Sequence, residues 1–61
     1  MPNLTSKELM AIDEQLSLEQ TMVKKFKLYA EACIDPQLKQ KCEKISAAHQ
    51  AHFMKLFNLL N

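Results

Sequence analysis

The side chains of this protein best suited to chemistry are its two histidines, which lie close together in the stretch AAHQAHFMKLF, residues 47–57. On a helix, a spacing of three positions places His49 and His52 on one side, one turn apart. Imidazoles bind transition metals, exchange protons and form hydrogen bonds with carboxylates. The elements that hold the two rings decide which of these roles they can take.

Two cysteines, Cys33 and Cys42, are the other reactive groups, and their spacing does not form a CxxC motif. In a reducing cytosol we expect two buried free thiols, because disulfides are rare there. A Cys33–Cys42 disulfide and a soft-metal site are the alternatives.

Local signals predict two helices and one sharp break. Thr5 and Glu8 have the spacing of a capping box, so the first helix should begin near residue 6. Pro36 cannot continue that helix, and it makes Asp35 the N-cap of a second one. The sequence therefore predicts a single all-α domain, 1–61. It should be an antiparallel hairpin of helices at about 6–34 and 36–60.

Heptad spacing predicts the faces on which the two helices meet. The predicted seam of the first helix contains Leu9, Ile12, Leu16, Glu19, Val23, Phe26, Ala30 and Cys33. That of the second contains Leu38, Cys42, Ile45, His49, His52, Leu56 and Leu59. All other seam positions are apolar or thiol, and the three exceptions are Glu19, His49 and His52. With the turn near residues 34–35, we expect Val23 to face His49 and Glu19 to face His52.

Burying a carboxylate and two imidazoles without partners is costly, so this polar layer needs an explanation. It could be a hydrogen-bonded Glu–His layer that fixes register and pairing. It could instead be a metal site, because helical bundles build such sites from inward carboxylates and imidazoles, which suit Zn, Fe or Mn. In a third interpretation the seam is shifted and Glu19 points to solvent.

Two helices packed along one seam leave apolar flanks uncovered. Met22 and Tyr29 extend the stripe of the first helix, and Phe53 and Leu60 extend that of the second. A second copy of the hairpin would cover these flanks and complete a homodimeric four-helix bundle.

Composition argues against several classes of function. The formal net charge is only +1 and arginine is absent, which disfavours a nucleic-acid binder. No apolar run is long enough for membrane insertion. The N-terminus does not resemble a signal peptide, so an intracellular location is expected. Neither a nucleophile elbow nor a phosphate-binding loop is present, and the sequence favours a non-enzymatic role.

Three segments, LTSKELMAIDEQLSLEQ, ACIDPQLKQKCEKI and HQAHFMKLFNLL, together resemble the spore coat protein F (CotF) family of endospore-forming bacteria. The resemblance covers nearly the whole chain, and its most specific part is the DPQLK turn followed by the histidine-containing helix. It implies a ferritin-like helical hairpin or bundle. It also implies a packing or assembly role in the spore coat or sporulating cell, with other coat proteins as partners.

The ferritin-like di-iron pattern permits a comparison residue by residue. Glu19 matches the glutamate of one helix, and His52 matches the histidine of a Glu-x-x-His motif. His49 stands where the second glutamate belongs, and the lost carboxylate argues against oxygen-activating iron chemistry. A Zn, Mn or simpler Fe site fits better. We therefore expect a structural assembly protein, with metal binding through Glu19, His49 and His52 as the alternative function.

Overall fold

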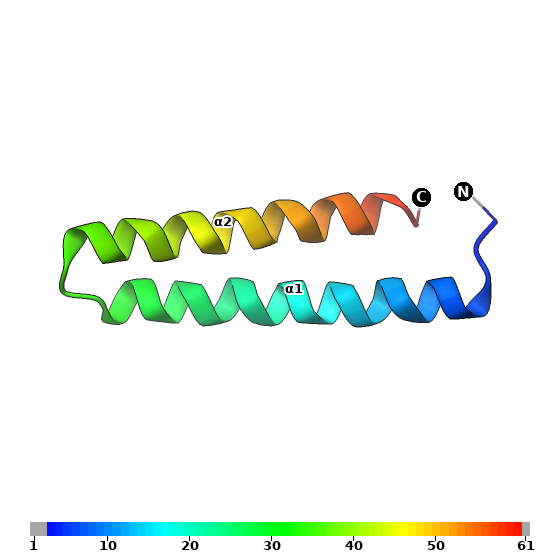
Figure 1. Ribbon diagram of the computed structural model, residues 1–61, viewed down its shortest axis with the longest axis horizontal. Helices are drawn as coiled ribbons and strands as arrows, with labels where there is room; N and C mark the ends of the chain where they lie inside the picture. Colours follow the sequence, from blue (N-terminus) through cyan, green and yellow to red (C-terminus); the bar gives the residue numbers. More distant parts are fainter. Residues whose placement is uncertain (1–2, 61) are drawn as a thin grey trace.

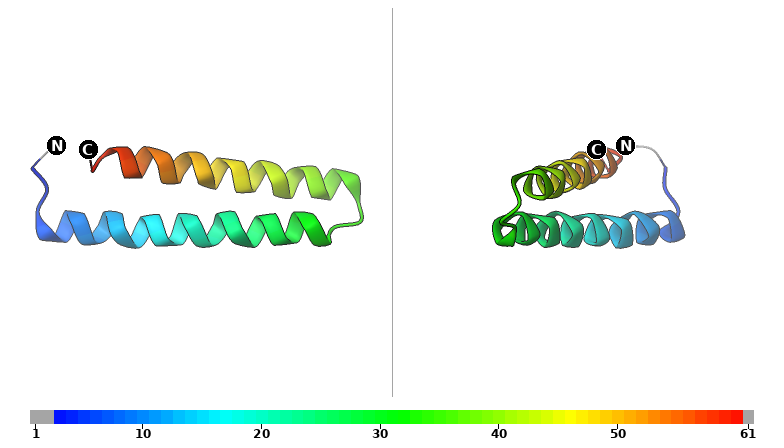
Figure 2. Two further views of the ribbon diagram at one scale, coloured as in Figure 1. Left: turned by 180° about the vertical axis from the view of Figure 1, so that it is seen from behind. Right: turned by 60° about the vertical axis from the view of Figure 1, so that its left-hand side comes forward.

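The fold is a hairpin of two long helices. The structure, a computed structural model, describes residues 3–60. Helix α1 spans Ser6–Ala32 and helix α2 spans Pro36–Asn58 (Figure 1). The helices lie side by side in opposite directions, as the two views of Figure 2 also show. Residues 3–60 contain no strand. The predicted all-α hairpin is thus confirmed.

Helix α1 begins at the predicted capping box. The Glu8 amide donates to the Thr5 hydroxyl at 3.1 Å, and the Thr5 amide donates to the Glu8 carboxylate at 2.9 Å. These reciprocal bonds satisfy two amide groups that have no partner within the helix. They fix where α1 starts.

The turn between the helices follows from the sequence Asp35–Pro36. The Asp35 carboxylate accepts hydrogen bonds from the Gln37 amide at 2.8 Å and the Leu38 amide at 3.4 Å, so it caps α2 as predicted. Cys33 is already extended and ends α1 two residues earlier than expected. The connection is therefore only residues 33–35.

The inner face of α1 matches the prediction except at Leu9, which is exposed, whereas that of α2 is rotated. In α1, the predicted seam residues Glu19, Val23 and Ala30 are buried. In the second helix and its C-cap, four predicted seam residues are exposed, so their predicted place in the seam is wrong: Leu38, Ile45, His52 and Leu59. The observed inner face of α2 contains Cys42, Ser46, His49, Phe53, Leu56 and Leu60, all buried or half-buried.

One buried hydrogen bond accompanies this rotation. The Ser46 hydroxyl donates to the Val23 carbonyl at 3.0 Å, and Ser46 is only 3% exposed. The predicted pairing of Val23 with His49 is therefore replaced by Val23 with Ser46. Residues that face each other across the hairpin lie at nearly equal distances in sequence from Ile34. The two helices are therefore shifted by about one helical turn relative to the predicted alignment.

The two edges of the hairpin differ in polarity. In an antiparallel pair of helices, one flanking heptad position of each helix lies on the same side of the pair. We call this side the open face; it carries Gln15, Met22, Tyr29, Leu38, Ile45, His52 and Leu59. The residues that follow inward positions form the opposite edge: Gln20, Lys27, Glu43, Gln50 and Phe57. The open face is therefore the apolar edge.

The hairpin is elongated and thinly packed. Its Cα extents are 47 × 14 × 10 Å and its radius of gyration is 14.3 Å. A compact domain of this length would have a radius of gyration of about 10.5 Å. Among residues 3–60, no side chain is fully buried, and the buried apolar residues are Val23, Ala30 and Cys42.

Across the residues described, neither helix combines the length and the apolar character that crossing a bilayer requires.

Candidate functional site

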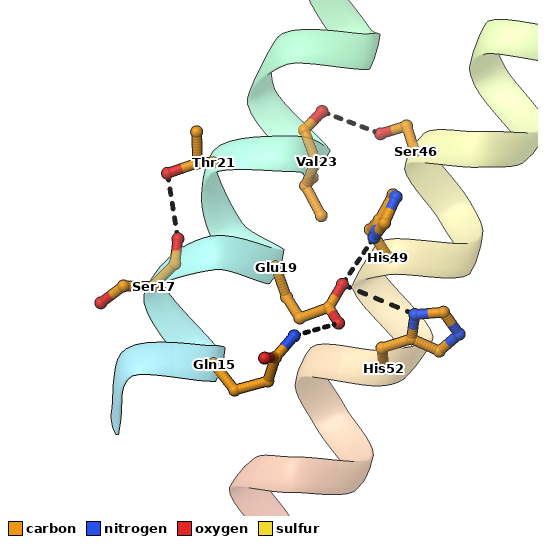
Figure 3. A network of polar contacts seen from close by, with 8 residues as sticks. All are labelled: Gln15, Ser17, Glu19, Thr21, Val23, Ser46, His49 and His52. Atoms are coloured by element: carbon orange, nitrogen blue, oxygen red, sulfur yellow. Dashed lines mark hydrogen bonds and ion pairs between the residues drawn. The ribbon is translucent and has the colours of Figure 1, made fainter. Parts of the chain in front are cut away.

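The polar residues of the two helices meet in one cluster near the middle of the hairpin. Glu19 extends from α1 toward His49 and His52 of α2 (Figure 3). The Glu19 Oε1 atom lies 2.5 Å from Nδ1 of His49 and 3.5 Å from Nδ1 of His52. Glu19 is 8% exposed, so its carboxylate lies between the helices and not in solvent. Residues from two distant parts of the sequence thus share one site, as predicted, although His49 is closer to Glu19 than His52 is.

The Glu19 carboxylate is held by hydrogen bonds from both helices. An ionised carboxylate can only accept, so the short contact requires a proton on Nδ1 of His49. The Gln15 side-chain amide donates to the other oxygen, Oε2, at 3.1 Å. The bond from His49 lowers the pKa of the Glu19 carboxyl from its ordinary value of 4.5, against the opposing effect of burial. The charged form of Glu19 is therefore favoured in the folded protein.

Two supporting residues were not identified from the sequence. Gln15 lies one turn before Glu19 on α1, and this spacing of four positions was the available signal. Phe26 stacks on His49, with ring centroids 6.3 Å apart and planes 19° apart. Nothing in the heptad pattern distinguished Phe26 from other seam residues. Together these contacts restrict both the carboxylate and the nearer imidazole.

His52 is the exposed member of the cluster. Its side chain is 55% exposed, compared with 23% for His49. The two rings meet edge to face, with centroids 5.6 Å apart. Since Nδ1 of His52 faces Glu19, the other ring nitrogen lies on the far side of the ring and points away from the carboxylate (Figure 3). The site is therefore accessible from the open face, on the side where His52 lies.

The cluster has the donors and spacing of a metal site. One ligand atom from each of Glu19, His49 and His52 lies within 4.8 Å of the others. Two imidazoles and a carboxylate are a common ligand set for Zn²⁺, and they also suit Fe²⁺ and Mn²⁺. Three protein ligands leave at least one coordination position for water or another group. The arrangement could therefore bind a divalent transition-metal ion.

The cysteines lie apart from this cluster. Cys42 is seven residues before His49 on α2, or about 10 Å along the helix axis. Both cysteines are free thiols, Cys33 half-buried and Cys42 buried. Burial, with a smaller contribution from neighbouring Cys33, raises the pKa of the Cys42 thiol. A thiol in this state is a poor nucleophile and a poor metal ligand at neutral pH.

Searches of protein-family models, curated proteins and solved structures found no match to this chain.

The lowered pKa of Glu19 predicts a specific loss of stability in acid. Because the folded-state pKa lies below the unfolded value, the carboxylate stabilises the fold above pH 4.5. This contribution is lost as the pH falls through the folded-state pKa. We expect Glu19→Gln to flatten the pH dependence of the urea midpoint as the pH falls below 4.5.

Glu43→Gln, which changes an exposed residue of α2, is the matched control and should keep the wild-type profile. Parallel profiles for Glu19→Gln and wild type would contradict the role assigned to the carboxylate.

Proposed function

We propose that the protein is a small assembly protein that pairs with a second copy to form a homodimeric four-helix bundle. The observation that supports this proposal most directly is surface area. The single chain of 7.1 kDa exposes 4925 Å². A compact monomer of that mass would expose about 4,100 Å². The surplus of about 800 Å² equals the share that one partner contributes to a standard protein interface.

The open face is the surface that a second copy would cover. It carries the exposed side chains of Tyr29, Leu38, Ile45 and Leu59 along the full length of the hairpin. Several large apolar side chains exposed on one side of a molecule are typical of an interaction site. A second layer of helices on this face would complete a core that the isolated hairpin lacks.

Within this proposal, the Glu–His cluster specifies how the helices pair. A seam of only apolar residues tolerates sliding, whereas a buried polar residue is satisfied in one alignment. The Glu19 carboxylate finds its partner in His49 at a single register. The cluster would thus set the alignment of each hairpin in the bundle.

We propose further that the protein carries out this assembly in the spore coat. It is supported by the three segments that resemble the spore coat protein F family, including the DPQLK turn that caps α2. Self-association of a small, rigid hairpin is compatible with a packing role in such a layer.

Metal binding is the second candidate function, favoured by the convergence of Glu19, His49 and His52 within 4.8 Å. The ion would be held by one carboxylate oxygen and two imidazole nitrogens. The two functions are compatible in one chain, because pairing would use the open face, whereas a metal would replace the hydrogen-bonded state of the cluster.

The pairing proposal predicts that the chain in solution has twice its mass of 7.1 kDa by light scattering. Ile45→Glu places a charge in the open face and should weaken pairing at least about a hundredfold, a loss of about 3 kcal/mol. Leu28→Glu adds the same charge to the outer side of α1, where Leu28 is exposed, and should leave the mass unchanged. A monomeric wild type, or equal effects of both variants, would rule out pairing through this face.

The coat proposal predicts that the protein is found in purified spore coats of the organism that encodes it. Quantitative mass spectrometry of coat fractions and of vegetative cells measures this directly. A protein equally abundant in growing cells and depleted from coats would contradict it.

The metal proposal predicts that Zn²⁺ raises the melting temperature of the wild type and that a chelator reverses the change. His52→Ala should abolish the Zn²⁺-dependent increase, while it changes the melting temperature in chelator little because the ring is half exposed. Cys33→Ser is the control for thiol binding and should retain the increase. An equal increase in the His52→Ala variant would exclude this site.

A further inference from the structure

The Glu–His cluster lies at the midpoint of the hairpin. Glu19 is the central residue of α1, with equal numbers of residues before and after it in Ser6–Ala32. Two copies can pair by twofold symmetry with their helices overlapping along the full length. The symmetry axis is then either parallel to the helices or perpendicular to them at their midpoint. In both arrangements the clusters of the two copies lie at the same height.

The cluster also opens toward the surface that pairing would cover. His52 lies on the open face between Ile45 and Leu59, each seven positions away on α2. Its ring contacts Glu19 through Nδ1, and its other nitrogen points away from the carboxylate. Pairing would therefore bring two His52 side chains toward each other near the middle of the shared face.

A metal ion in this cluster would lack a full set of protein ligands in one copy. Glu19, His49 and His52 supply three donors, and tetrahedral sites need four. In the isolated hairpin the remaining donor would be water. In the pair, the second copy would present its own His52 imidazole near the middle of the shared face.

We infer that binding of a divalent transition-metal ion at this cluster and pairing of two copies through the open face are coupled, with one ion per pair held by Glu19, His49 and His52 of one copy and by His52 of the other. The inference rests on the proposed pairing and metal site, and it adds that each strengthens the other. Coupling free energy is reciprocal, so the factor by which metal tightens pairing is the factor by which pairing tightens metal binding.

Sedimentation equilibrium of the full chain, with Zn²⁺ or with chelator, tests the coupling. We expect Zn²⁺ to tighten pairing about tenfold or more, within the usual range of coupling between sites. His52→Ala should show no tightening by Zn²⁺ relative to its own pairing in chelator. Helical circular dichroism establishes that this variant is folded. Lys55→Ala, an exposed neighbour on α2, is the control and should respond as the wild type does.

The reciprocal arm measures Zn²⁺ affinity by calorimetry. Ile45→Glu, with the cluster intact but pairing weakened, should bind Zn²⁺ more weakly by the factor found above. Zn²⁺ binding without any change in pairing would overturn the coupling and leave the metal site standing. Pairing without Zn²⁺ binding would overturn both the metal site and the coupling. Tightening that persists in His52→Ala would identify zinc bridging elsewhere on the surface and would also overturn the inference.

Discussion

The hairpin depends on one buried carboxylate and its partners. Removing a charged group from water is costly unless hydrogen bonds compensate for it. The Glu19 carboxylate receives such bonds from His49 on the opposite helix and from Gln15 on its own. Sliding α2 by one turn, or rotating it by one position, would remove the bond from His49. The polar layer thus selects one alignment among several that the apolar residues alone would permit.

The helices themselves could be predicted because their boundaries are set by local chemistry. Thr5 and Glu8 define the start of α1, and Asp35 with Pro36 defines the break, through bonds between residues at most three positions apart. The inner face of α2 could not be predicted in the same way. Ile45 and Leu59 form one apolar stripe, and Phe53 and Leu60 form another beside it, so periodicity alone does not distinguish them. The choice between these stripes is tertiary: Ser46 reaches the Val23 carbonyl only when the second stripe faces inward.

The rotation of α2 changes which histidine is the main partner of Glu19. The sequence indicated that Glu19, His49 and His52 share a layer, and they do, but the predicted contact of Glu19 with His52 is secondary to that with His49. As a result the two imidazoles differ. His49 lies against Phe26 and bonds the carboxylate, whereas His52 lies at the edge of the open face. His49 and His52 are equivalent in the predicted heptad pattern, but in the structure His49 holds the carboxylate and His52 faces outward.

The hydrogen-bonded layer and the proposed metal site would be alternative states of the same atoms. Two ligands of a tetrahedral Zn²⁺ ion lie about 3.3 Å apart, given bonds of about 2.0 Å. The 2.5 Å contact between Glu19 and His49 is shorter than this separation and is made through a proton on the ring. A metal bound by these two atoms must displace that proton and move them apart, so it competes with the contact that aligns the helices. His52 makes only the longer contact of 3.5 Å and gives up least when it becomes a ligand. Metal binding is therefore favoured where the new ligand bonds, including any from a second copy, outweigh the loss of the Glu19–His49 pair.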